Sequence, residues 1–194
     1  MKNRGIFFSL MLLLVFALLS PLLFQGLSHT ITVSIDEKPP YKGILCVYYK
    51  KAGMNDWVEL GCSENTLTNI GKNYTERQLI EPQAASTANQ LKYIALSNVS
   101  TACTSTSTNI QEITTNNLQR ALCTVTHLDY GKWSCEQTFT ANAYTPNVQI
   151  AGLFWNGTAG HDGSLFACGN FTPVTLEQND NILIRWNITI SEGS

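Results

Sequence analysis

The sequence predicts an all-β protein, an antiparallel β-sandwich with Ig-like or jelly-roll connectivity, preceded by an N-terminal hydrophobic α-helix. Two observations indicate the sandwich. About seven short β-rich segments follow one another within about 100 residues, and turns rich in Gly, Asn and Asp separate them. Helical periodicity is also absent after residue 30, except near Arg77. A third observation, one long apolar run near the N-terminus, predicts the helix.

The apolar run covers residues 6–27 and is the longest in the chain. At about 1.5 Å per residue its helix would reach about 33 Å, enough to cross a hydrocarbon core of about 30 Å. Lys2 and Arg4 precede the run, and no basic cluster follows it closely. The positive-inside rule therefore places the remainder outside the cytoplasm. We expect residues 1–28 to be a signal or anchor helix, which associates with the membrane if it is not cleaved.

Two general interpretations of this run compete. In a secretory signal peptide, Pro21 would break the helix, and the small residues Gly26 and Ser28 would precede a cleavage before His29. In an uncleaved anchor the length is right, and neighbouring helices would tolerate the kink at Pro21. Both interpretations lead to an extracellular or cell-surface location.

A third interpretation comes from a resemblance. Lys2-Asn-Arg-Gly5, followed at once by Ile6-Phe-Phe8, resembles the class III leader of type IV pilins. The resemblance implies cleavage between Gly5 and Ile6, after which the helix would pack into the core of a filament. Bacterial pilins carry Glu at the fifth mature position, where this chain has Leu10; archaeal pilins commonly lack that Glu. The three interpretations remain open.

Charge and cysteine usage limit the function classes. Charged residues make up 13% of the chain, the net charge is −2, and no Lys/Arg cluster occurs, so nucleic acid is excluded as an expected partner. All six cysteines follow the apolar run, which predicts disulfides in an exported protein. No C-x-x-C or His-flanked spacing suggests a metal site. The pairs that flank expected turns, and the pair left over, are Cys46–Cys62, Cys123–Cys135 and Cys103–Cys168.

Residues 29–88 are expected to form an N-terminal strand, a disulfide-linked hairpin and a connecting loop. Residues 30–35 alternate as a strand, which Pro39 and Pro40 follow. The β-rich runs 43–52 and 57–63 flank a turn and predict the hairpin. The polar stretch 64–90 is the expected domain boundary, with a short helix or an edge strand at 75–81.

Residues 89–194 are expected to form the sandwich domain. A Ser/Thr-rich loop is predicted at 99–109. The β-rich segments are 91–98, 112–121, 122–128, 132–143, 148–155, 164–176 and 182–191.

The final segment has the clearest pattern. Ile182, Ile184, Trp186, Ile188 and Ile190 share one face, while Arg185, Asn187 and Thr189 share the other. The second set is expected to face solvent, which suits the glycosylation sequon at Asn187. The candidate glycosylation sites are Asn73, Asn98, Asn156, Asn170 and Asn187.

A series of short motifs resembles a β-sandwich family that recurs among tailed-phage virion proteins and uncharacterised archaeal or bacterial surface proteins. The resemblance covers about 100 residues in the same order; it implies a structural role and brings no catalytic residues. This chain departs from it by adding the cysteines, the hairpin and the export segment, which favours a cellular surface protein. The motifs are Tyr93–Leu96, Glu112–Asn116, Leu118–Ala121, Phe139–Ala141, Ala151–Phe154, Leu165–Ala167, Phe171–Leu176 and Asp180.

Candidate chemistry is confined to one turn. His161 and Asp162 are adjacent in a Gly-rich loop, but Ser164 is in no G-x-S-x-G elbow, so we expect no catalytic site, no metal and no cofactor. The tryptophans suggest sugar stacking instead, and Trp155 is the one expected to be exposed. Trp155, His161 and Asp162 are the candidate ligand contacts.

The sequence therefore predicts a non-enzymatic, exported structural protein that self-associates into a pilin-like filament or a surface layer. The alternative is a surface adhesin or carbohydrate-binding module that contacts glycans. A virion structural protein ranks third.

Overall fold

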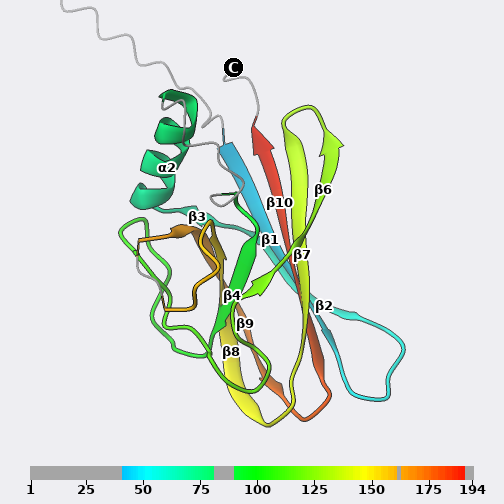
Figure 1. The fold of residues 1–194 in the computed structure, drawn as a ribbon. Coiled ribbons are helices and arrows are strands. Elements are labelled where there is room, and N and C mark those ends of the chain that lie inside the picture. The colour runs from blue at the N-terminus through cyan, green and yellow to red at the C-terminus, as the bar shows by residue number, and fades with distance from the viewer. Residues whose placement is uncertain (1–40, 81–89, 161–162, 191–194) are drawn as a thin grey trace, which may run out of the picture. The chain divides into compact units, whose positions relative to one another are not determined.

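Two antiparallel sheets of five strands each face one another as a β-sandwich in the computed structural model, which describes residues 41–80, 90–160 and 163–190 (Figure 1). The strand order is β2-β1-β10-β7-β6 in the first sheet and β3-β9-β8-β4-β5 in the second. The expected helix at 6–27 and strand at 30–35 lie outside the described residues. The elements are β1 (Tyr41–Lys50), β2 (Val58–Glu64), β3 (Thr66–Leu67), α2 (Asn69–Ile80), β4 (Tyr93–Ser97), β5 (Ala121–Leu122), β6 (Thr124–Asp129), β7 (Lys132–Thr140), β8 (Thr145–Phe154), β9 (Leu165–Leu176) and β10 (Asn181–Ile190).

Strand β10 lies at the centre of the first sheet. It pairs with β1 along its whole length, from Ile190 opposite Tyr41 to Asn181 opposite Lys50, and with β7 on its other side. In the immunoglobulin order the last strand lies at a sheet edge. The expected β-sandwich is confirmed, but its Ig-like variant does not describe this strand order.

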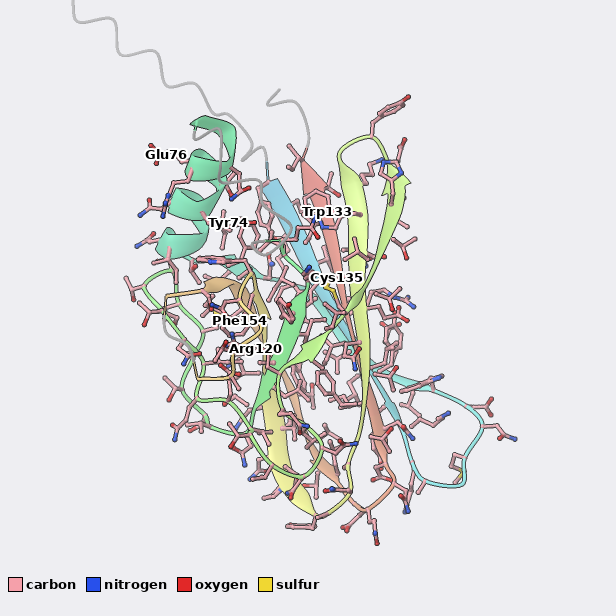
Figure 2. The ribbon with its side chains drawn as sticks, viewed as in Figure 1. Tyr74, Glu76, Arg120, Trp133, Cys135 and Phe154 are labelled. Atoms are coloured by element: carbon pink, nitrogen blue, oxygen red, sulfur yellow. A yellow bond between two sulfur atoms is a disulfide. The ribbon has the colours of Figure 1, made fainter. Side chains whose placement is uncertain are left out.

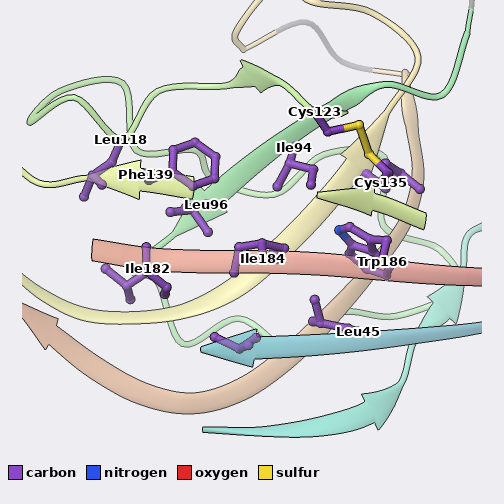
Figure 3. Close-up of a cluster of buried hydrophobic side chains, with 14 of the residues drawn as sticks. Leu45, Ile94, Leu96, Leu118, Cys123, Cys135, Phe139, Ile182, Ile184 and Trp186 are labelled. Atoms are coloured by element: carbon purple, nitrogen blue, oxygen red, sulfur yellow. A yellow bond between two sulfur atoms is a disulfide. The ribbon is translucent and has the colours of Figure 1, made fainter. Parts of the chain in front are cut away.

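The predicted alternation of β10 is confirmed for most of its length. Ile182, Ile184, Trp186 and Ile188 are at most 1% exposed, and the residues between them are half-buried on the opposite face. Ile190 differs, because it ends the strand and is 52% exposed. The same set of β10 side chains forms the middle of the main core, together with Leu45, Ile94, Leu96, Leu118, Phe139 and the Cys123–Cys135 disulfide (Figure 3).

The N-terminal hairpin, expected in a unit 29–88 apart from the sandwich at 89–194, is joined to the sandwich by strand pairing. Strands β1 and β2 do pair, as predicted, but β1 also pairs with β10, and β3 pairs with β9. The compact unit extends from Glu37 to Ser194. The reason is burial: β1 places Leu45 and Val47 in the core, whereas an isolated hairpin is marginally stable in water.

Helix α2 includes most of segment 75–81, where a short helix or an edge strand was expected, but it begins earlier. Thr68 caps it: its hydroxyl accepts the Gly71 N–H at 3.0 Å and donates to the Leu165 carbonyl at 2.5 Å. Gly71 cannot be replaced freely, because a Cβ there would lie 2.2 Å from the Phe166 carbonyl oxygen. The cap and the glycine therefore fix α2 against the start of β9.

A long irregular segment, residues 98–120, reaches both hydrophobic clusters, and its Ile113 and Leu118 lie in the main core. Its Ile110 and Cys103 form a second, smaller cluster with residues of β4, β8 and β9. The strand expected at 112–121 is wrong except for Ala121, which begins β5. Asn116 and Asn117 adopt φ values of 57° and 62°, and this left-handed backbone interrupts an extended chain.

Asp180 fastens the turn between β9 and β10 to the end of β1. Its buried carboxylate accepts hydrogen bonds from the Tyr49 hydroxyl and the Ala52 N–H, both at 2.7 Å, and from the Glu177 N–H at 3.0 Å. Burial by itself would raise the pKa of Asp180, but these hydrogen bonds hold the pKa below its ordinary value of 3.8. Burial and the contact with Asp180 raise the pKa of Tyr49 to about 12.

We predict that Ile184→Ala lowers the free energy of unfolding by about 2–5 kcal/mol, because it leaves a cavity between the sheets. Thr138→Ala, at an exposed position on neighbouring β7, is the control and should change it by less than about 0.5 kcal/mol. Urea unfolding of both variants, followed by circular dichroism, measures the difference. Equal stability of the two variants would contradict the assigned core.

We predict that Asp180→Asn costs about 1–3 kcal/mol of stability at neutral pH, since it weakens a buried hydrogen-bonded carboxylate. Because the folded pKa is depressed, this contribution is present above the ordinary pKa of 3.8 and is lost as the pH falls further. The urea midpoints of the variant and the parent should therefore converge in acid.

We predict that Tyr49→Phe removes a loss of stability that the parent shows at alkaline pH. The raised pKa of Tyr49 means that its contribution is complete below the ordinary value of 10.0 and is lost as the pH rises to about 12. The parent should lose that increment over this range, and Tyr49→Phe should not. Parallel curves for the parent and either variant would refute the contact.

Candidate functional site

The sequence-predicted site is the turn between β8 and β9, and Trp155 stands at its start. Trp155 is half-buried rather than exposed. Its ring stacks on Tyr74 of α2 with the centroids 4.5 Å apart and the planes at 15°, and Phe166 meets Tyr74 edge-on. One face of the indole is thus already covered by the chain itself. His161 and Asp162 lie outside the described residues.

A buried ion pair, Arg120 with Glu112, holds the base of this turn. Both side chains are at most 1% exposed. Arg120 donates from Nε to Glu112 Oε2 at 3.1 Å and from Nη1 to the Asn156 carbonyl at 2.6 Å. Glu112 also accepts the Gly160 N–H at 3.2 Å. Arg120 therefore fixes the turn at Asn156, and Glu112 fixes it at Gly160.

Aromatic packing completes the surroundings of Arg120. The guanidinium carbon lies 3.7 Å from the centroid of the Phe154 ring, and Figure 2 shows the two side chains together beneath α2. Ser164 is fully buried, and its hydroxyl lies 3.4 Å from Arg120 Nη1. Arg120 is thus engaged by a carboxylate, a carbonyl and a ring, which is an arrangement that positions a loop rather than one that binds a ligand.

Ionisable side chains do not gather elsewhere into a metal site. Within residues 41–80, 90–160 and 163–190, no group of three or more His, Cys, Asp or Glu side chains could hold a metal ion. His127 is exposed on β6, and His29 lies outside these ranges.

The three predicted disulfides are confirmed. Cys46–Cys62 joins β1 to β2, Cys103–Cys168 ties the irregular segment 98–120 to β9, and Cys123–Cys135 links the start of β6 to β7. Three disulfides indicate an oxidising environment, extracellular or periplasmic.

The five sequons occupy different surroundings. Asn73 on α2 and Asn98 after β4 are exposed. Asn170 is exposed as well, but its side-chain oxygen accepts the Cys103 N–H at 3.0 Å. Asn156 and Asn187 are half-buried. A glycan is therefore accommodated most simply at the first two sites.

An exposed apolar surface was not expected from the sequence. Five large apolar side chains, each more than half exposed, lie along β5, β6, the turn after β6 and the end of β10. We call this surface the hairpin patch; it consists of Leu122, Val125, Leu128, Tyr130 and Ile190. In sequence, residues 122–128 look like any half-buried strand, and only the pairing shows that β6 is an edge.

Hydrogen bonds fix the backbone of the turn that forms the tip of the patch. Tyr130 is 95% exposed, at a turn in which Gly131 has a φ of 67°. The Asp129 carboxylate accepts the Tyr130 N–H at 2.8 Å and pairs with Lys132 at 3.3 Å. The Ile190 N–H donates to the Gly131 carbonyl at 2.8 Å, which ties β10 to the turn.

Sequence analysis also missed the ion pair between Glu112 and Arg120, because both residues lie in an irregular segment with no periodic pattern.

Among the described residues, no helix is long and apolar enough to span a membrane. Comparison of the chain with protein-family models, with curated proteins and with solved structures found no significant match.

We predict that Glu112→Leu and Arg120→Met each cost about 3–5 kcal/mol of stability, because each leaves one buried charge unpaired. The double variant Glu112→Leu/Arg120→Met should cost less than the sum of the single changes. Urea unfolding of all variants gives the coupling free energy. Additive effects would contradict a direct, buried pair.

Proposed function

We propose that this chain is an exported structural subunit that assembles with copies of itself into an extracellular filament or surface layer. The observation that carries the proposal is the hairpin patch, because exposed apolar surface gathered at one edge is the usual mark of a protein–protein contact. Figure 1 places the β6–β7 turn at the same end of the sandwich as the end of β10, and the hydrogen bond from the Ile190 N–H to the Gly131 carbonyl joins the two.

The patch has the features of an assembly surface. Tyrosine is enriched in interface cores, and hydrogen bonds fix the backbone of the turn that presents Tyr130. β6 is also an edge strand with all six of its residues exposed. A net charge of −2 means that two copies repel one another weakly.

The disulfides support the extracellular part of the proposal. Three covalent links suit a subunit that works outside the cell, where chaperones cannot rescue unfolded chains. The pilin-like form of the proposal rests on Lys2 to Gly5 and the apolar run 6–27. In that form, cleavage after Gly5 frees Ile6, and the helix packs in the filament core.

We predict that Val125→Ser/Tyr130→Ser, introduced into the full chain as exported by an expressing host, weakens self-association at least about tenfold, or about 1.4 kcal/mol. Sedimentation velocity measures the association. Met54→Ser, at another exposed apolar residue on the β1–β2 turn, is the matched control and should leave it unchanged. Unchanged assembly of the double variant would exclude the hairpin patch as the contact.

Mass determination of the mature N-terminus tests the filament form separately. A chain that begins at Ile6 supports the pilin-like form, and electron microscopy should then find filaments. A chain that begins at His29 excludes it and leaves only a surface layer or a secreted assembly.

A further inference from the structure

We propose that Cys46–Cys62 is a thiol-exchange site, which an external dithiol opens while the other two disulfides stay closed, and that its opening releases β2 from the sandwich. The proposal is independent of self-assembly. It rests on the exposure of one cysteine residue, on the position of the disulfide between two paired strands, and on how little β2 contributes to the core.

Cys62 differs from the other five cysteines in its exposure to solvent. It is an exposed residue on edge strand β2. In the other two disulfides, Cys123, Cys135 and Cys168 are at most 6% exposed, and Cys103 is half-buried under the loop that contains it. A thiolate must approach a sulfur along the S–S axis, so the disulfide that has an exposed cysteine reacts first.

The disulfide also joins two directly opposed residues. Cys46 and Cys62 are partners in the β1–β2 register, and their Cα atoms are 4.1 Å apart. The Cα separations of the other two disulfides are 5.8 and 5.5 Å. The cross-strand pair therefore has the shortest Cα separation of the three. Exposed disulfides are the more easily reduced ones.

The exchange proceeds in two balanced steps. One thiolate of the dithiol attacks Cys62 Sγ, a mixed disulfide forms, and the bonding pair of the old S–S bond leaves on Cys46 Sγ. Asn187 Nδ2, 4.0 Å from Cys46 Sγ, faces the developing thiolate as a donor. The second thiol of the reagent, as its thiolate, then attacks the sulfur of the mixed disulfide that belongs to the reagent. The products are a cyclic disulfide and two protein thiols, which carry the two protons of the dithiol.

Strand β2 contributes little to the core, because only its half-buried Leu60 packs against the main cluster. Every residue of β2 except Leu60 is exposed, and the β1–β2 register shifts between Val47 and Tyr48. β1 keeps its full pairing with β10. Release of β2 would uncover the edge of β1 that pairs with it, and would widen the shallow hollow of about 340 Å³ that β2 forms with β9. The hollow is lined by Leu60, Gly61, Cys62, Ser63, Asn170, Phe171 and Thr172.

Glu59 makes the site selective for the charge of the reagent. Its Oε1 lies 3.8 Å from Cys62 Sγ. The carboxylate repels an anionic thiol such as glutathione and does not repel a cationic one such as cysteamine.

The test uses the folded, full chain in graded dithiothreitol, with trapping by alkylation and peptide mapping. We expect Cys46 and Cys62 to be labelled at least about tenfold faster than the other four cysteines. Hydrogen exchange should then show loss of protection in β2 and in the β1 amides that bond to it, while the ladder between β1 and β10 stays protected. Earlier or simultaneous opening of either other disulfide, or loss of protection throughout the sandwich, would overturn the proposal.

The second measurement uses the variant Glu59→Gln. Glu59 is exposed, so the substitution should leave the fold intact. The variant should speed labelling by glutathione more than labelling by cysteamine. Glu64→Gln, exposed at the end of β2, is the control for net charge and should produce a smaller difference between the reagents. Equal acceleration by both reagents in Glu59→Gln would contradict attack at Cys62.

Discussion

The sandwich depends on the central position of β10. This strand, the last one described, pairs with β1, the first, and with β7, and it supplies the row of buried side chains around Trp186. The first sheet therefore cannot close before the end of the chain is available, which is the non-local pairing that makes β-sandwiches fold slowly. The indole N–H of Trp186 has no hydrogen-bond partner within the described ranges. The core keeps this polar group because the rest of the ring fills the space between the sheets.

A different kind of interaction holds the irregular segment 98–120. It has no strand ladder to satisfy its backbone, and long loops of this kind remain ordered only when other contacts fix them. Here Cys103–Cys168 joins it to β9, the Ile113 N–H donates to the Leu96 carbonyl at 2.8 Å, and Arg120 pairs with Glu112. The buried ion pair specifies position more than it adds stability, because desolvation offsets most of the attraction.

The sequence was informative wherever a pattern repeats over short distances. Alternation in 182–188, turn residues around 53–56, and cysteines that flank turns predict β10, the first hairpin and the disulfides. Sequence patterns did not predict features that depend on contacts between residues far apart in the chain. Whether residues 122–128 are central or at an edge is decided by which strand lies beside them, and the role of Arg120 is decided by a carboxylate in an irregular segment. The exposure of Trp155 was predicted wrongly for the same reason, since Tyr74 covers it from α2.

Strand β2, which carries Cys62, and strand β6, which carries part of the hairpin patch, lie at opposite edges of the first sheet. In the order β2-β1-β10-β7-β6, three strands separate β2 from β6, which corresponds to about 19 Å at the usual strand spacing of about 4.8 Å. Opening Cys46–Cys62 therefore changes one edge and leaves the hairpin patch at the other edge intact. β10 lies between them and its pairing with both neighbours persists. A reduced subunit would accordingly keep its assembly surface and gain a newly open edge, on β1, with different chemistry.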